Sequence, residues 1–372
     1  MIYLNNAATS HPKPPGVTEA VCQALSSPPC EKQRGALGGT DAAELCRRAL
    51  APVLGVREPS RVFFTSGATE SYNLILRGLH PAGKVSVVSA FEHNALLRPL
   101  WAHTCGEGVR ILTPDDDGIL SPDMLRALAM GADFVFVNHC SNVTGVVQDL
   151  PVLSRAAHDS CALLIADVSQ SAGMMPLNLD ESGTDIAVFT GHKALFGPAG
   201  TGGFYLRAGV PLPAAKWGGT GSGGRMILPD EPESFEVGTQ NLCGLAGLAA
   251  GAAFVSETGL DAIARAMREK VARLHRALDN MTGVRVYGKP SGGAAVAFNI
   301  DGLSPADVGY ILRHGYDIVV RTGYHCAPLL ADAIGAPGGT VRASLSYYST
   351  EAELEQFLHA VSELATGMKG VS

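Results

Sequence analysis

The sequence predicts an α/β protein with a doubly wound, mostly parallel seven-stranded sheet and a small C-terminal α+β domain. Three observations predict this fold class. Short β-branched runs alternate with helical patterns from about residue 60 to 210, several of these runs are apolar throughout, and 372 residues are too many for one compact core. Continuous apolar runs are typical of strands that are buried on both faces, as in parallel sheets.

Seven segments are the predicted strands of this sheet. They are residues 61–65, 84–89, 109–113, 133–138, 162–167, 185–190 and 202–206. Helical patterns lie between most of them, and in one Ser121 can cap a helix with Pro122 at its first position. Residues 211–243 are rich in glycine and proline and are predicted to be irregular. A long helix is expected from about 244 to 281, and the remainder forms the small α+β domain.

The composition excludes several classes of protein. The hydrophobic content of 46%, with 17% charged residues, fits a packed enzyme rather than a disordered or fibrous chain. A net charge of −7 without a Lys/Arg run argues against nucleic-acid binding. The eight cysteines are scattered without a C-x-x-C pair, which favours free thiols in a reducing compartment over disulfides or a metal site. Without a signal-peptide pattern or a membrane-spanning apolar run, a cytoplasmic enzyme is expected.

Residues 218–224 contain a G-x-G-x-x-G pattern, which in other contexts marks a dinucleotide site. A dinucleotide site requires a strand before the pattern and a helix after it. Here Pro229 and Pro232 follow and would interrupt a helix, so we interpret the segment as a loop.

Residues whose side chains can bind a ligand or take part in catalysis follow several predicted strands. In open α/β sheets, ligands bind beyond the carboxyl ends of the strands. Residues 66–71 form a glycine turn into a helix, whose free N–H groups and Thr69 hydroxyl suit a phosphate; a plain strand–helix turn is the alternative. His93 is a base, a ring that stacks on a flat cofactor, or a surface residue. Asn142 is a substrate donor or a turn residue.

Two further strand ends carry opposite charges. Asp167 ends an apolar strand and needs a partner such as a protonated pyridine nitrogen. Lys193, the only lysine between positions 85 and 215, is either a surface lysine or an amine kept dry to form a Schiff base. A phosphate-binding turn, a ring-stacking histidine, a strand-end aspartate and such a lysine together are what pyridoxal phosphate requires.

The chain resembles the class V aminotransferase group of fold-type I pyridoxal-phosphate enzymes, and within it most closely the cysteine desulfurases. The segments that carry the resemblance occur in the family's order and cover nearly the whole chain: YLNNAAT, FTSGATESYNL, FEHNALLRPL, SNVTG, IADVSQSAG, FTGHKALFGPAGTGG, FEVGTQN, RTGYHCAP and VRASLSYYST. We expect residues 1–15 to pack with the small domain, residues 16–250 to form the large cofactor-binding domain, and residues 251–372 to form the small domain with the catalytic cysteine loop.

The resemblance implies a role for each site residue. Lys193 binds the cofactor's aldehyde, His93 stacks on the ring and transfers protons, and Asp167 pairs with the pyridinium nitrogen. Gln170 bonds the phenolic oxygen. The phosphate is surrounded by Ala68, Thr69, Thr190 and His192, and is approached in a homodimer by Gly238 and Thr239 of the other subunit. The substrate carboxylate is held by Asn142 and Arg342, with Arg321 nearby.

Cys326 distinguishes a desulfurase from a plain aminotransferase. It alone among the eight cysteines sits in a polar glycine loop, residues 321–330, although a loop cysteine without chemistry is the alternative. The tight loop resembles the type II, SUF-like branch, which includes selenocysteine lyases. The sequence departs from the family at Gln240, where proline is usual, and in a shortened segment at 225–236.

The resemblance therefore implies conversion of L-cysteine to L-alanine, with a persulfide on Cys326 that passes to an acceptor protein. Selenocysteine lyase activity, another class V reaction with Cys326 incidental, and a degenerate homologue without turnover stay open. The intact Lys193, Asp167, His93 and Arg342 argue against the degenerate homologue.

Overall fold

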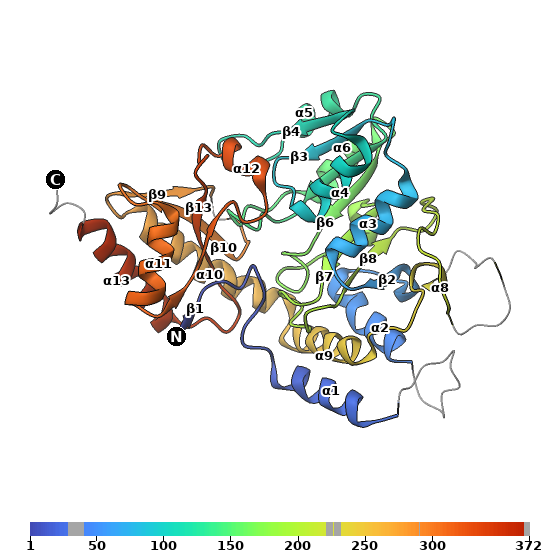
Figure 1. The fold of residues 1–372 in the computed structure, drawn as a ribbon, viewed down its shortest axis with the longest axis horizontal. Helices are drawn as coiled ribbons and strands as arrows, with labels where there is room; N and C mark the ends of the chain where they lie inside the picture. The colour runs from blue at the N-terminus through green and yellow to red at the C-terminus, as the bar shows by residue number, and fades with distance from the viewer. Residues whose placement is uncertain (29–40, 221–225, 227–231, 290, 368–372) are drawn as a thin grey trace.

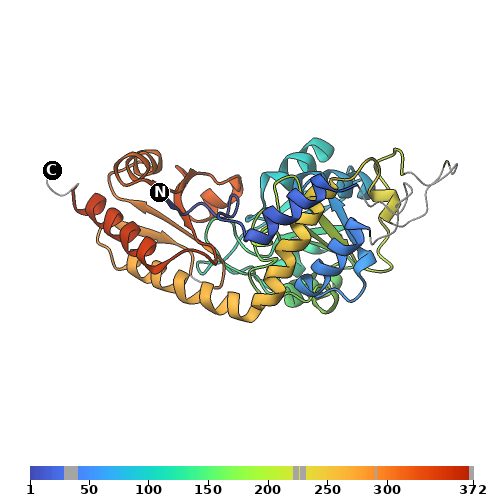
Figure 2. The same ribbon diagram turned by 90° about the horizontal axis from the view of Figure 1, so that it is seen from below.

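The chain forms two lobes that are joined by a pair of long helices, α9 (Leu242–Thr258) and α10 (Leu260–Asp279) (Figures 1 and 2). The structure, a computed structural model, describes residues 1–28, 41–220, 226, 232–289 and 291–367. Most of the G-x-G-x-x-G pattern and Cys30 therefore lie outside the described residues.

The larger lobe is built on a seven-stranded sheet with the order β2-β8-β7-β6-β5-β3-β4. All neighbouring pairs are parallel except those of β8, which is antiparallel to both β2 and β7. This confirms the predicted fold class and all seven predicted strands. The strands are β2 (Val62–Thr65), β3 (Ser86–Ser89), β4 (Val109–Leu112), β5 (Phe134–Asn138), β6 (Leu163–Asp167), β7 (Ile186–Thr190) and β8 (Gly202–Leu206).

Helices cover both faces of this sheet, and the central strands alternate between the two cores that result (Figure 1). In β6, for example, Leu164 and Ala166 enter one core and Ile165 enters the other. Burial on both faces explains why these strands read as continuous apolar runs. The helices are α1 (Pro15–Ser26), α2 (Ala42–Leu54), α3 (Ala68–Leu79), α4 (Asn94–Thr104), α5 (Pro122–Ala129), α6 (Leu150–His158), α7 (Leu179–Ser182) and α8 (Pro232–Phe235), with a short 3₁₀ turn, η1 (Pro59–Arg61).

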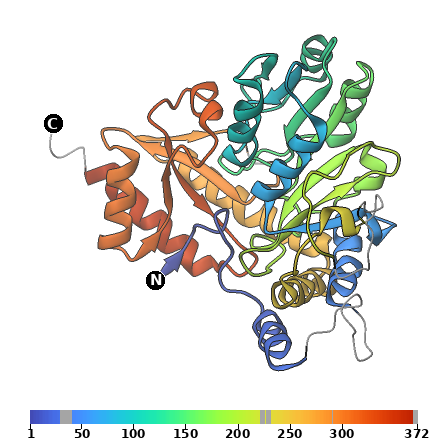
Figure 3. The same cartoon turned by 45° about the vertical axis from the view of Figure 1, so that its right-hand side comes forward.

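The smaller lobe has an antiparallel sheet with the order β12-β13-β10-β9. The N-terminal strand β1 (Ile2–Tyr3) pairs with β11 (Ile318–Val319) in this lobe, whereas α1 lies against α9 in the other lobe (Figure 3). The other elements of the lobe are β9 (Val284–Tyr287), β10 (Ala295–Ile300), β12 (Arg321–Gly323), β13 (Thr340–Ser344), α11 (Pro305–Gly315), α12 (Pro328–Ala333) and α13 (Glu351–Gly367).

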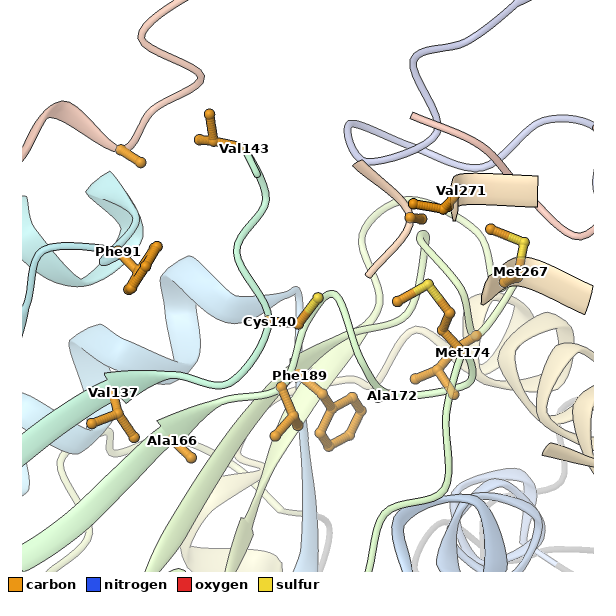
Figure 4. Packing of buried hydrophobic residues seen from close by; sticks show 14 of the residues in the cluster. Phe91, Val137, Cys140, Val143, Ala166, Ala172, Met174, Phe189, Met267 and Val271 are labelled. Carbon is orange, nitrogen blue, oxygen red and sulfur yellow. The ribbon is translucent and has the colours of Figure 1, made fainter. Parts of the chain in front are cut away.

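The segment expected to be helical from about 244 to 281 is helical almost throughout, but it is divided into two helices that are bent by 81° relative to each other. The break is at Gly259, whose φ of +87° is a conformation that glycine adopts without the steric cost that other residues incur. The bend lets α9 pack in the large lobe and α10 in the small lobe. In Figure 4, Met267 of α10 lies beside Met174, which follows β6, so apolar contacts link the two lobes.

No single helix among the described residues is long and apolar enough to cross a membrane; α9 and α10 reach that length and hydropathy only as a sharply bent pair.

Candidate active site

A cavity of about 320 Å³ lies beyond the carboxyl ends of the large sheet's strands. It is lined by residues that follow β2, β3, β5, β6 and β7, together with Ala7 and Ala8 near the N-terminus and Arg321 of β12. The structure brings most of the sequence-predicted site residues to its walls: Ala68, Thr69, His93, Asn142, Asp167, Gln170, Thr190, His192, Lys193 and Arg321.

One end of the cavity is formed by the start of α3. The N-cap residue is Gly67, which has no side chain to satisfy the helix's first N–H groups, so those of Ala68 and Thr69 remain available to a ligand. Thr190 lies opposite, with its Oγ1 about 3.7 Å from the position of a Cβ on Gly67. Because the helix dipole adds positive potential at this terminus, the arrangement suits an anionic group such as a phosphate.

Asp167 ends β6 and Lys193 follows β7, the neighbouring parallel strand, so both residues lie at the same edge of the sheet and line the same cavity. Burial lowers the pKa of Lys193 to about 8, and the negative charge of Asp167 only partly opposes this shift. Asp167 is 4% exposed, and its Oδ1 accepts a hydrogen bond of 2.8 Å from the Ser169 N–H. The amine is therefore neutral in a larger fraction of molecules at pH 7–8 than an ordinary lysine, as a nucleophile for an aldehyde requires.

His93 caps the N-terminus of α4 through its ring. The Nδ1 atom accepts a hydrogen bond of 3.0 Å from the Ala95 N–H, which places the proton of the neutral ring on Nε2. Burial, followed by the charge of Lys193, lowers the pKa of His93 to about 4. The ring is thus neutral at pH 7, with one donor directed away from its own helix.

The N-terminal segment holds the backbone around Lys193. Ser10 Oγ donates to the Lys193 carbonyl at 2.7 Å, and the Lys13 ammonium donates to the His192 carbonyl at 2.8 Å. Gln170 Nε2 donates to the carbonyl of Ala7 at 3.0 Å. Burial also lowers the pKa of His192 to about 4, so this ring is neutral beside the lysine.

Cys326 lies in a tight turn that follows β12. The Ala327 N–H donates to the Tyr324 carbonyl at 2.9 Å, and both central residues have positive φ, 51° at His325 and 61° at Cys326. This is the pattern of a type I′ turn, which normally contains glycine or asparagine. Non-glycine residues are strained there, and such strain is concentrated at functional positions.

Several hydrogen bonds hold this turn, among them those from Arg321, Asn94 and Asn142. Arg321 Nη2 donates to the Cys326 Sγ at 3.0 Å, and the Asn94 N–H donates to the Cys326 carbonyl at 2.8 Å. Asn142 Nδ2 donates to the His325 carbonyl at 2.8 Å. Because Arg321 and Asn142 also line the cavity, Arg321 links the thiol to the cavity wall and Asn142 links the backbone of the turn to it.

Arg342 is fully buried beside the cavity and is not among the lining residues. Its Nη1 donates to the Asn142 carbonyl and its Nη2 to the Asn5 Oδ1, both at 2.8 Å, while its Nε has no partner. Burial and the charge of Arg321 lower the pKa of Arg342 to about 9. The expected role of Asn142 and Arg342 in holding a substrate carboxylate stays a prediction.

Gly238 and Thr239 are exposed and lie outside the cavity lining of their own chain. The Gly238 N–H donates to the Gly219 carbonyl at 2.8 Å. Their expected contact with the phosphate of another subunit stays a prediction.

Sequence reasoning missed two groups of residues at this site. Asn138 ends β5 and lines the cavity, and the rule that ligands bind at strand ends could have found it. Asn5, Ser10 and Lys13 contact the site only because the N-terminal segment crosses from one lobe to the other, which no local pattern signals. Among the described residues, no three His, Cys, Asp or Glu side chains cluster as metal ligands would.

Comparisons with known proteins agree with this geometry. The family model for aminotransferase class-V matches residues 2–357. A probable cysteine desulfurase from Methanothermobacter thermautotrophicus is 33% identical over 98% of this chain and 94% of its own length. The apo structure of a cysteine desulfurase from Thermococcus onnurineus superimposes with a TM-score of 0.88 at 33% identity and covers 98% of this chain and 95% of its own.

A second solved structure, the Escherichia coli cysteine desulfurase CsdA in its S-sulfonic acid form, has a TM-score of 0.86 at 26% identity, over 98% of this chain and 94% of its own. The family model matches almost the whole chain, and the alignment with the relative from Methanothermobacter also covers nearly all of both proteins. The chain therefore belongs to the aminotransferase class-V family.

Proposed function

We propose that this protein is a pyridoxal-phosphate-dependent cysteine desulfurase. It converts L-cysteine to L-alanine and retains the sulfur as a persulfide on Cys326. The observation that carries the proposal is the 3.0 Å hydrogen bond from Arg321, a residue of the cavity wall, to the Cys326 sulfur. This contact holds the sulfur next to the wall of the cavity in which a substrate would bind.

The residues of the cavity fit pyridoxal phosphate. The open N-terminus of α3 suits its phosphate, the buried carboxylate of Asp167 suits a protonated ring nitrogen, and the depressed pKa of Lys193 suits an aldehyde. When bound, this cofactor supplies an electron sink for bonds adjacent to the substrate's amino group. The neutral ring of His93 provides a stacking surface, and its Nε2–H provides a hydrogen-bond donor.

The sulfur-transfer step balances without an external oxidant. The Cys326 thiolate attacks the substrate sulfur, a new S–S bond forms, and the bonding pair of the substrate's C–S bond stays with carbon, which takes up a proton. The products are alanine and a Cys326 persulfide. Arg321 and Asn142 hold the turn at the cavity through the Cys326 sulfur and the His325 carbonyl.

The proposal includes a homodimer, in which Gly238 and Thr239 of each subunit reach the phosphate site of the other. Their exposure in the single chain supports this arrangement. A sulfur-acceptor protein takes the persulfide from Cys326, whose turn includes the 54% exposed Tyr324. The proposed location is the cytoplasm, where the free thiols stay reduced.

The decisive experiment measures alanine release from L-cysteine by the cofactor-loaded protein with a reductant. Cys326→Ala is compared with wild type and with Cys22→Ala, which alters an exposed cysteine on α1. We expect Cys326→Ala to lose alanine release while it keeps the cofactor's absorbance, and Cys22→Ala to match wild type. Equal release by all three proteins overturns the desulfurase assignment. L-selenocysteine in parallel identifies a lyase if it alone is turned over.

A further inference from the structure

Glu92 is a fully buried carboxyl group for which the proposed reaction has no use. It lies between β3 and α4, directly before His93, and its exposed fraction is 0%. One carboxyl oxygen, Oε1, accepts a hydrogen bond of 2.7 Å from Ser89 Oγ. The other oxygen, Oε2, has no hydrogen-bond partner. A buried carboxylate with an unpaired oxygen is costly, whereas a carboxylic acid carries only a dipole.

A second buried carboxyl group, that of Asp167, is close by. Asp167 pairs in register with Asn138, and the Asn138 N–H lies 3.5 Å from the Ser89 hydroxyl that holds Glu92. The phenol of Tyr72, from α3, is buried beside both carboxyl groups, and its pKa is raised well above its usual value by burial, by Asp167 and by Glu92. The cluster therefore contains three acidic groups on three elements.

The surroundings of the two carboxyl groups differ. Asp167 opens onto the cavity, accepts the Ser169 N–H and faces the ammonium of Lys193. Glu92 is not among the residues that line the cavity, and burial followed by the charge of Asp167 raises its pKa to about 8, against the hydrogen bond from Ser89. Two nearby carboxyl groups in a low-dielectric interior do not both ionise readily.

We propose that Glu92 is a positioning residue that is kept as a neutral carboxylic acid, with its proton on Oε2, so that Asp167 is the only charged carboxyl group of this buried cluster. A proton on Oε2 turns the unpaired oxygen into a donor. The buried Asn138 Oδ1, which also lacks a partner, is an acceptor in the same cluster. A donated bond there orients the Asn138 side chain on the cavity wall, next to Asp167 in the sheet.

The first test uses cofactor-free protein, so its outcome is independent of the proposed reaction. Infrared difference spectra at pH 7 compare wild type with Glu92→Gln, whose amide matches the shape of the neutral acid. We expect wild type to show a protonated-carboxyl band that disappears as the pH rises, with a midpoint of about pH 8. We expect Glu92→Gln to lack this band. The control is Glu44→Gln, a surface residue of α2 that pairs with Arg48, and there a carboxylate band should be lost.

The second test uses the cofactor-loaded protein and rests on the proposed function. The pH midpoint of the cofactor's absorbance change should move by less than about 0.3 unit in Glu92→Gln, because no charge is removed. If Glu92 were ionised, removal of its charge would lower the midpoint by about one unit or more. A carboxylate band lost from Glu92→Gln at pH 7, or a midpoint shift of that size, overturns the proposal.

Glu92→Asp provides the same infrared comparison if the amide variant does not fold. It keeps an acid at position 92, so a protonated-carboxyl band that moves to a new frequency belongs to this residue. An unchanged protonated-carboxyl band in Glu92→Asp contradicts the proposal.

Discussion

The guanidinium of Arg321 donates a hydrogen bond of 3.0 Å to the sulfur of Cys326, five residues further along the chain. Arg321 begins β12 and Cys326 lies within the turn that follows it, so the strand determines the position of the guanidinium and the turn determines that of the sulfur. Arg321 is also part of the cavity wall, and it thus places a positive charge between the thiol and the site where substrate is expected to bind.

We expect Arg321→Gln to lower the rate of alanine release. The hydrogen bond from the guanidinium holds the Cys326 sulfur at the cavity wall, and a shorter, neutral side chain removes that contact. In an assay of alanine release from L-cysteine, kcat should fall about tenfold or more. Arg313→Gln, which alters an exposed ion pair with Asp317, is the control. An unchanged kcat would show that the contact between Arg321 and Cys326 does not position the sulfur for the reaction.

The positive φ of Cys326 predicts an unusual order of stability. Glycine adopts this conformation freely, whereas a Cβ costs about 1–2 kcal/mol, so Cys326→Gly should be more stable than Cys326→Ala by about 1 kcal/mol. In α1, Cys22→Gly should instead be less stable than Cys22→Ala by about 1 kcal/mol, because glycine is a poor helix former. Urea unfolding measures the free energy of unfolding of both pairs of variants. If the alanine variant were the more stable one at both positions, the turn at Cys326 would not be strained.

The depressed pKa of Lys193 predicts the pH dependence of cofactor capture. Only the neutral amine attacks an aldehyde, and its fraction rises with pH through the pKa of about 8 rather than the ordinary 10.5. The rate at which cofactor-free protein binds pyridoxal phosphate covalently should therefore increase from pH 6.5 and level off above about pH 8.5. Stopped-flow absorbance measures this rate, and Lys193→Ala is the blank. A rate that still rises steeply between pH 9 and 10 would show that burial does not depress the pKa.

The positions of the strand ends could be predicted from the sequence, because the periodicity and the apolar character of a segment are local properties of the chain. Asp167, Thr190 and Lys193 follow runs that read as buried strands, and the sheet then necessarily brings them to one edge. The break at Gly259 was missed because glycine inside a helical pattern is often tolerated, and only the need to pack two helices in two lobes requires a bend there.

The contacts of Arg342 could not be predicted by such reasoning. Its partners, Asn5 and Asn142, are 337 and 200 residues away in the chain, and they meet only because the N-terminal segment crosses between the lobes. The resemblance to the family indicated that Arg342 is important. It did not indicate that the side chain is fully buried and that two of its nitrogens already have partners.

Gly191, which follows β7 and precedes Lys193 by two residues, is closely packed. A Cβ at this position would lie 2.2 Å from Thr201 Oγ1 and 3.0 Å from Leu248 Cδ1, and the backbone is held by hydrogen bonds between the Gly191 N–H and Thr201 and between the Gly197 N–H and Gly191. Because Thr201 Oγ1 is itself bound to the Pro198 carbonyl, it cannot move aside without losing that bond.

Gly191→Ala should therefore destabilise the protein by about 1–3 kcal/mol and displace the backbone that carries Lys193. We expect a lower urea midpoint together with weaker covalent capture of pyridoxal phosphate, measured by absorbance at a fixed cofactor concentration. Gly219→Ala is the control, because a Cβ there meets no atom within 4 Å and φ is not positive. If Gly191→Ala captured the cofactor as well as Gly219→Ala, close packing at Gly191 would not be what positions Lys193.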